Sequence, residues 1–181
     1  HLHPALQYRF LAFLKRQLRD DIRRGYKGSC QLFLTSHSTH VSAAVGLVSL
    51  CCLCLDQEGN PHVAYPGRAF GPKQQASKAY VERFLDATKS SLLFAKSVLF
   101  VEGIAEQLLV PRLADLALTA EEEPSLLDRN YVAVVRVDGV TFVHFLPLFG
   151  MTDDPHSANG LRDRRVACLT DSDPVMPSPT M

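Results

Sequence analysis

The predicted fold is decided by Val98-Leu99-Phe100-Val101-Glu102-Gly103-Ile104-Ala105-Glu106, where an apolar, strand-like run leads directly into two carboxylates. A second apolar run, Val166-Ala167-Cys168-Leu169, leads in the same way to Asp171-Ser172-Asp173. The carboxyl ends of parallel strands lie on one edge of a sheet, where ligands bind. Carboxylate oxygens are the hard ligands that Mg²⁺ and Mn²⁺ prefer. The four carboxylates therefore predict a divalent-cation site and chemistry on phosphates.

Strands and helices alternate around this stretch, which predicts an α/β fold. The predicted strands span residues 98–101, 131–137 and 166–169. The predicted helices span residues 105–118, with a kink at Pro111, and 141–149. This order implies a parallel sheet with right-handed crossovers.

The first half of the chain is predicted to contain two helices and several short apolar runs. Apolar residues recur at helical spacing from Pro4 to about Arg24, and again from Ser77 to about Lys96. Residues 31–35 form a strand-like apolar run, and residues 47–55 form another apolar stretch. Glycine and proline are frequent between residues 61 and 73, which indicates a loop or a domain junction.

The composition argues against several classes of protein. The chain has 19 basic residues (lysine and arginine) and 19 acidic residues (aspartate and glutamate), so its net charge is zero. This balance argues against a nucleic-acid binder that is basic overall, although a local basic face is compatible with it. No apolar stretch reaches the roughly 18–20 residues that span a bilayer, so we expect no membrane partner. The five cysteines fit neither a disulfide framework nor a zinc site, so we predict a cytoplasmic protein.

Each acidic pair also has a structural interpretation that needs no metal. A glutamate in the first turn of a helix, such as Glu106, is favoured by the helix dipole. An Asp-x-Asp sequence is often a turn or a helix cap. The placement of both pairs at the ends of two predicted parallel strands favours the metal site.

Residues 93–111 closely resemble the start of the TOPRIM domain of the OLD family. Members of this family are ATP-dependent endonucleases in which an ABC-type ATPase is followed by a TOPRIM nuclease domain. Asp171-Ser172-Asp173 falls at the position of the family's Asp-x-Asp metal motif, and Val137-Asp138-Gly139 is similar to its middle strand. The resemblance implies a metal-dependent DNA endonuclease that uses two Mg²⁺ or Mn²⁺ ions.

The resemblance also assigns roles to the four carboxylates. Glu102 would be a metal ligand or the general base, Glu106 a second ligand, and Asp171 and Asp173 the ligands from the other strand. Glu102 and Asp171 are the expected catalytic residues. The alternatives are another TOPRIM enzyme, such as a primase or a topoisomerase, and a non-catalytic DNA-repair or SMC-like ATPase subunit.

The first 45 residues resemble the ATPase half of the same family. The segment His1-Leu2-His3-Pro4-Ala5-Leu6-Gln7 is similar to the one that follows the Walker B acidic residues. Thr35-Ser36-His37-Ser38 resembles the switch loop, so His37 is the expected sensor of the γ-phosphate of ATP. The sequence has no Gly-x-x-x-x-Gly-Lys-Ser/Thr loop to cradle phosphates, so we expect a fragment whose full-length parent uses ATP.

These expectations divide the chain into four parts. Residues 1–75 are predicted to be the C-terminal part of an ABC-type ATPase domain, and residues 76–97 a connecting helix. Residues 98–173 are predicted to be a truncated, parallel-sheet TOPRIM domain, followed by a disordered tail over residues 174–181. We expect DNA as the partner, through residues that the sequence does not assign, and a homodimer through the ATPase domain.

Overall fold

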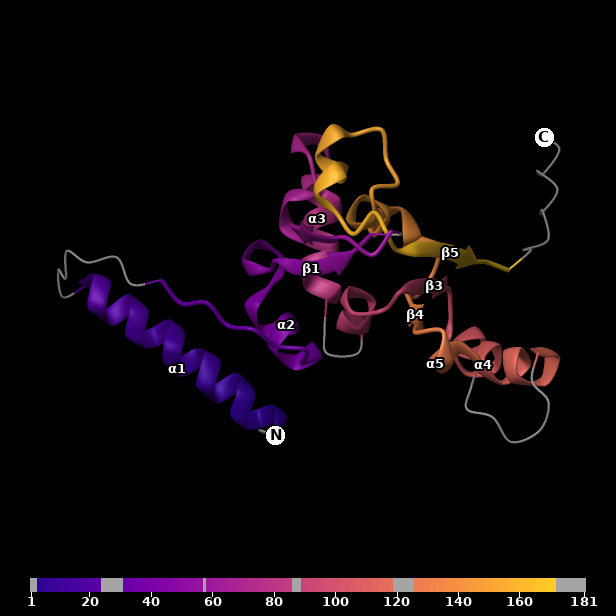
Figure 1. Ribbon diagram of the computed structural model, residues 1–181, viewed down its shortest axis with the longest axis horizontal. Helices are drawn as coiled ribbons and strands as arrows, with labels where there is room; N and C mark the ends of the chain where they lie inside the picture. The colour runs from indigo at the N-terminus through magenta and orange to yellow at the C-terminus, as the bar shows by residue number, and fades with distance from the viewer. Residues whose placement is uncertain (1–2, 24–30, 57, 86–88, 119–125, 172–181) are drawn as a thin grey trace, which may run out of the picture.

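The chain has a mixed α/β structure built around a three-stranded parallel sheet (Figure 1). The computed structural model describes residues 3–23, 31–56, 58–85, 89–118 and 126–171. In these ranges the helices are α1 (Pro4–Arg23), α2 (Thr39–Val45), α3 (Gln75–Phe84), α4 (Ile104–Leu118) and α5 (Leu126–Arg129). The strands are β1 (Cys52–Leu55), β2 (Pro61–Ala64), β3 (Ser97–Val101), β4 (Val132–Arg136) and β5 (Arg165–Leu169). The 3₁₀ helices that join them include η4 (Lys89–Leu93), η5 (Thr141–His144) and η6 (Leu146–Phe149). The tail predicted over residues 174–181 lies outside the described residues.

The parallel sheet has the strand order β4-β3-β5, so β3 is the central strand. Val101 at the end of β3 lies opposite Arg136 of β4 and Leu169 of β5. The three strands therefore end level with one another. The predicted strands and their parallel arrangement are confirmed.

The central strand is buried because apolar side chains cover it on both faces. Val98 and Phe100 point to one face, and Val101 is buried on the other. This is the apolar pattern typical of an inner parallel strand. By contrast, β5 is an edge strand in which four of the five residues are exposed.

The core lies between the sheet and the 3₁₀ helices that follow β4. The ring of Phe100 packs against those of Phe142, Phe145 and Phe149, with centroids 6.5, 5.2 and 6.0 Å away. The same buried cluster reaches Leu47 and other residues before the sheet, including Val81 of α3. One continuous hydrophobic core thus joins these earlier residues to the sheet.

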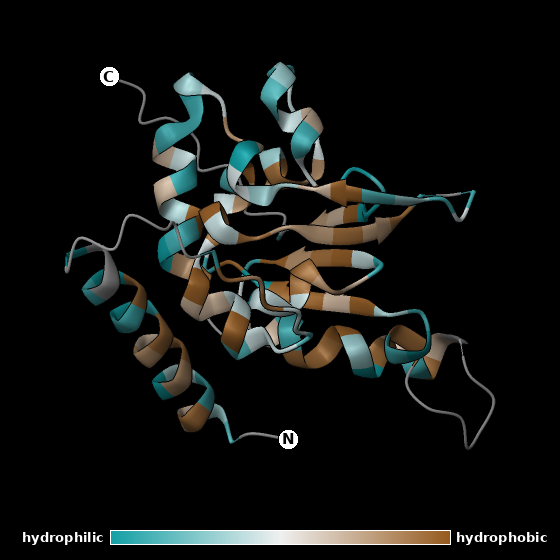
Figure 2. Ribbon diagram, turned by 60° about the vertical axis from the view of Figure 1, so that its left-hand side comes forward, coloured by the Kyte–Doolittle hydropathy of each residue, from teal (hydrophilic) through white to brown (hydrophobic). Residues whose placement is uncertain are grey.

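Helices α4 and α5 lie on the other side of the sheet, where both contact β4 (Figure 1). The predicted helix over residues 105–118 is confirmed as α4, with Pro111 inside it. In Figure 2 the strands of the sheet are mainly hydrophobic in colour, whereas α1 carries both colours along its length.

Helix α1 confirms the helix predicted from Pro4. It contacts α2, and Lys15 Nζ donates a hydrogen bond to the carbonyl oxygen of Ala44 at 3.0 Å. Neither α1 nor any other helix within the described part of the chain is long and apolar enough to cross a membrane.

The strand-like run at residues 31–35 is not a strand. These residues have no regular secondary structure, and the side chain of Phe33 is 87% exposed. A strand is stable only when a neighbouring strand accepts and donates its backbone hydrogen bonds, and none pairs with this segment in the described ranges.

Two predicted helices are shorter or tighter than expected. The helix predicted over residues 77–96 ends at Phe84. Leu85 leaves the helical conformation (ψ 80°), and its side chain is buried in the core. In the later part of the predicted range, residues 89–93 form the 3₁₀ helix η4. The helix predicted over residues 141–149 is the pair η5 and η6. Pro147 explains this second difference, since proline has no N–H for an α-helical hydrogen bond.

Strand β2 lies in the segment that was predicted to be a loop. It pairs antiparallel with β1, so that Leu53 lies opposite Val63. The connecting turn is closed by Asp56, whose carboxylate accepts hydrogen bonds from the backbone N–H groups of Glu58 and Asn60 at 2.9 and 2.8 Å. The aspartate and Gly59 (φ +88°) were the hairpin signal in this stretch.

Candidate functional site

The carboxyl edge of the parallel sheet gathers acidic residues from all three strands. Glu102 directly follows β3, Asp138 follows β4, and Asp171 follows β5. Because the strands end level, these residues lie along one edge. The sequence predicted this edge as the site of Glu102 and Asp171.

Glu102 is half-buried, and its backbone is fixed by the neighbouring strand. Its carbonyl oxygen accepts a hydrogen bond from the N–H of Gly139 at 3.1 Å. One residue earlier, the carbonyl oxygen of Val101 accepts one from the N–H of Val137 at 3.0 Å. The hydrogen bonds from Val137 and Gly139, the residues that follow β4, therefore fix the backbone from which the Glu102 side chain extends.

Glu106 lies in the first turn of α4 and folds back over the start of the helix. Its Oε2 accepts a hydrogen bond from the backbone N–H of Gly103 at 2.9 Å. This is the glutamate half of a capping box, and it satisfies a donor that the helix itself cannot pair. The structural role considered for Glu106 is thus present, and one oxygen still has lone pairs for another partner.

The Asp-x-Asp pair lies at the limit of the described chain. Asp171 is the last described residue and is exposed, while Asp173 lies outside the described residues. Within residues 3–171, leaving out the undescribed gaps, no three His, Cys, Asp or Glu side chains lie close enough to hold a metal ion. The four-carboxylate site stays a prediction, because one of its four members is not described.

Asp138 is a functional candidate that belongs to neither of the two predicted acidic pairs. Its Oδ1 lies 2.8 Å from Nε of Arg136, and its Oδ2 lies 3.7 Å from Nζ of Lys89. Its backbone is left-handed, with φ +58°, and Gly139 follows at φ +110°. The signal that could have found it is the sequence Val137-Asp138-Gly139, which places an acidic residue and a glycine at the end of a strand.

His37 lies in the irregular segment before α2 and is exposed. Its ring centroid is 6.1 Å from that of Phe94, just ahead of β3. Ser38 caps α2 by accepting a hydrogen bond from the N–H of Val41, and α2 packs against η4. The segment of the predicted nucleotide sensor is therefore in contact with the residues that lead into the sheet.

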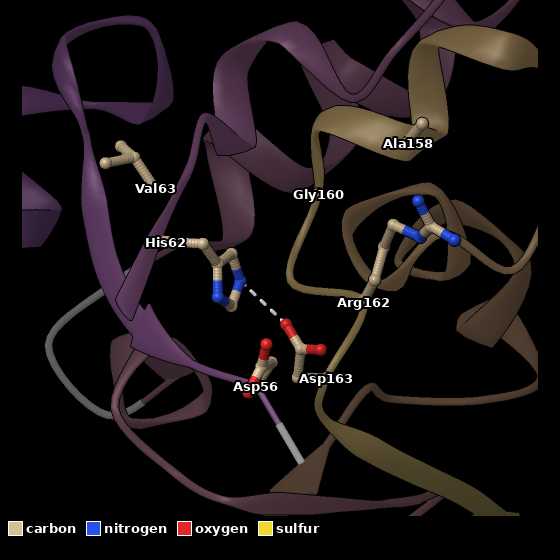
Figure 3. A pocket seen from close by; sticks show the side chains of 7 residues that line it. All are labelled: Asp56, His62, Val63, Ala158, Gly160, Arg162 and Asp163. Carbon is tan, nitrogen blue, oxygen red and sulfur yellow. Dashed lines mark ion pairs between the residues drawn. The ribbon is translucent and has the colours of Figure 1, made fainter. Parts of the chain in front are cut away.

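A second cluster of titratable groups lies at the opposite, amino-terminal end of β5 (Figure 3). His62 of β2 pairs through Nε2 with Oδ2 of Asp163 at 2.7 Å, and these residues line a cavity of about 470 Å³ together with Asp56 and Arg162. Nδ1 of His62 is buried and has no hydrogen-bond partner among the described residues. Hydrogen bonding from the Asn60 backbone holds the pKa of Asp56 below its ordinary value. The contact between His62 and Asp163 joins the hairpin to the segment before β5 and is separate from the carboxyl edge.

Of the two cysteines of β1, Cys54 is buried and Cys52 is partly buried, and neither belongs to a metal-binding cluster in the described ranges. Burial, and then the neighbouring Cys54, raise the pKa of the Cys52 thiol to about 11. Burial also raises the pKa of Cys54, against the opposing effect of the Arg164 guanidinium, whose Nη2 lies 3.7 Å from Sγ. Cys54 and, in part, Cys52 thus behave as small apolar residues, whereas Cys51 is exposed.

Iodoacetamide is expected to alkylate Cys51 much faster than Cys52 at pH 8. Cys51 is exposed, whereas a thiol with a pKa of about 11 is ionised in only about one molecule in a thousand at that pH. The rate at Cys52 should rise as the pH approaches 11, because only the thiolate reacts. Tandem mass spectrometry of the peptide distinguishes the two positions, and equal rates at pH 8 would contradict the prediction.

Residues 93–173 match the family model of the Overcoming lysogenization defect protein-like TOPRIM domain. This segment is a little less than half of the chain and includes β3, α4, β4 and β5. No curated protein matches the chain. The match confirms the TOPRIM part of the resemblance, with which the parallel sheet is consistent, and a TOPRIM domain of this type points to metal-dependent, nuclease-type chemistry. The ATPase part of the resemblance lies outside the matched residues.

Proposed function

We propose that the protein is the nuclease module of an ATP-dependent endonuclease of the OLD type, which hydrolyses phosphodiester bonds in DNA. The observation that supports this proposal most strongly is the position of Glu102. It stands at the carboxyl end of the central strand, inside the segment that matches the OLD-like TOPRIM model. A half-buried carboxylate at that edge is placed where α/β sheets bind ligands.

The donor set of this edge suits a hard divalent cation. Carboxylate oxygens are the ligands that Mg²⁺ and Mn²⁺ prefer, and Glu102, Glu106, Asp171 and Asp173 would hold the ions. Ions bound there would stabilise charge on the attacking and leaving oxygens of an in-line displacement. Asp138 is not in this set, because Arg136 and Lys89 neutralise its carboxylate.

The chain's own residues would perform two tasks at this edge. Glu102 would act as a metal ligand or as the general base that accepts a proton from the attacking water, from a backbone position held by the hydrogen bond from Gly139. Glu106, four residues after Glu102 in the chain, would supply the second carboxylate while its Oε2 closes the first turn of α4. The fixed backbone reduces the cost of bringing these groups into position, which is how a preorganised site favours a reaction.

The proposal includes an ATPase half in the longer parent protein. His37 would sense the nucleotide there, DNA would be the substrate, and a dimer would form through the ATPase domain. The contact between His37 and Phe94 supports a connection between this half and the TOPRIM domain.

Conversion of supercoiled plasmid into nicked circles by the full-length protein tests the proposal. We expect nicking with Mn²⁺ or Mg²⁺ and none with EDTA, together with Mn²⁺ binding measured by calorimetry. A protein that binds DNA but neither nicks it nor binds Mn²⁺ would instead be a non-catalytic ATPase subunit. Cleavage through a covalent tyrosine intermediate would indicate a topoisomerase.

A further inference from the structure

Asp138 is held by two cationic side chains that come from different parts of the chain. Arg136 lies on β4 itself, 2.8 Å from Oδ1, and Lys89 lies on η4, 3.7 Å from Oδ2. The side chain of Lys89 is only 14% exposed, and its ammonium also lies 5.1 Å from the ring centroid of Phe84. A charge so largely removed from water is stable in the fold when an opposite charge lies close to it.

The turn that carries Asp138 has a backbone conformation that needs support. Asp138 has φ +58°, a conformation that aspartate and asparagine tolerate better than most residues, and Gly139 has φ +110°. The two ion pairs act on the first of these residues. They therefore help to keep the turn in its left-handed form.

This turn is also the part of β4 that contacts Glu102. The N–H of Gly139 donates to the carbonyl oxygen of Glu102, one residue after the ladder bond from Val137 to Val101. If the turn relaxed, the backbone of Glu102 would lose the hydrogen bond that defines its position. The ion pairs of Asp138 and the placement of Glu102 are thus linked through one peptide group.

We propose that Asp138, held between Lys89 and Arg136, is a positioning residue that fixes Glu102 at the carboxyl edge. It acts through the hydrogen bond from Gly139 and contacts neither substrate nor metal. This inference rests on the proposed function, in which Glu102 is part of the nuclease site. It assigns a task to Lys89, a residue outside the matched TOPRIM segment.

The test compares Asp138→Asn with the wild-type protein in plasmid nicking at increasing Mn²⁺ concentration. Asparagine keeps the size of the side chain and tolerates positive φ, but it cannot form the two ion pairs. We expect the Mn²⁺ concentration for half-maximal nicking to rise about tenfold or more, the effect typical of losing a group that orients a metal ligand. Asp153→Asn, which changes an exposed carboxylate outside this turn, should leave that concentration unchanged.

Lys89→Met keeps the buried stem of the side chain and removes its charge, so it should shift the Mn²⁺ dependence in the same direction. The double variant should shift it no further than the larger single change, because both act on one group. Hydrogen exchange at Gly139 supplies a readout that needs no activity, and Asp138→Asn should accelerate it. A variant with unchanged exchange and unchanged Mn²⁺ dependence would overturn the positioning role. A wild-type protein that does not nick would instead overturn the proposed function.

Discussion

Glu102→Gln is expected to reduce metal-dependent nicking by more than about 100-fold, since even the partners that orient metal ligands contribute about 10–100-fold. Glutamine has the shape of glutamate but no negative charge and no basic oxygen for a proton. The backbone bond from Gly139 to residue 102 does not involve the side chain, so the fold should be kept. Initial nicking rates at saturating Mn²⁺, with the midpoint of urea unfolding as the measure of folding, provide the test.

Two further variants make this result specific. Glu82→Gln changes an exposed glutamate on α3 and should nick at the wild-type rate. Glu106→Gln retains an amide oxygen that can accept the hydrogen bond from Gly103, so it removes the charge while leaving the helix cap in place. Wild-type nicking by Glu102→Gln would contradict the catalytic role of this carboxylate.

Phe100→Ala is expected to lower the free energy of unfolding by about 3–5 kcal/mol, the range measured for large aromatic residues in protein cores. Phe100 is fully buried at the centre of the sheet, and three phenylalanine rings surround it. Alanine would leave a cavity that these rings cannot fill without moving from their own contacts. Urea unfolding followed by circular dichroism measures the loss.

Phe33→Ala is the matched control for this change. The same atoms are removed, but the Phe33 side chain is 87% exposed, so the free energy of unfolding should change by no more than about 0.5 kcal/mol. Equal effects of the two substitutions would show that the core is not where the structure places it.

The parallel sheet could be predicted because each of its strands is recognisable in the sequence as a short apolar run. The strands are three short, mainly apolar runs, at residues 97–101, 132–136 and 165–169, and α4 follows directly from the first run. The secondary structure was predicted wrongly where it depends on contacts with residues far away in the sequence. Residues 31–35 have strand propensity, but none of the described strands pairs with them. Leu85 leaves its helix to enter the core.

Of the candidate site, only the residues that directly follow a predicted strand could be placed from the sequence. Glu102 and Asp171 follow apolar runs, so the sequence places them on one edge. Nothing local to Lys89 indicates that it lies against Asp138, because the contact depends on how η4 packs beside β4. Likewise, the capping bond of Glu106 depends on a rotamer that its sequence position does not specify.

The continuous core around Phe100 determines which parts of the chain unfold together. Leu47 and Val81 of α3 belong to the same buried cluster as Phe100, so we expect these residues to unfold in one cooperative unit with the parallel sheet. Helix α1 has only Leu11 buried among its described side chains. It can therefore open at a small cost in free energy while the sheet, and the edge that carries Glu102, stays folded.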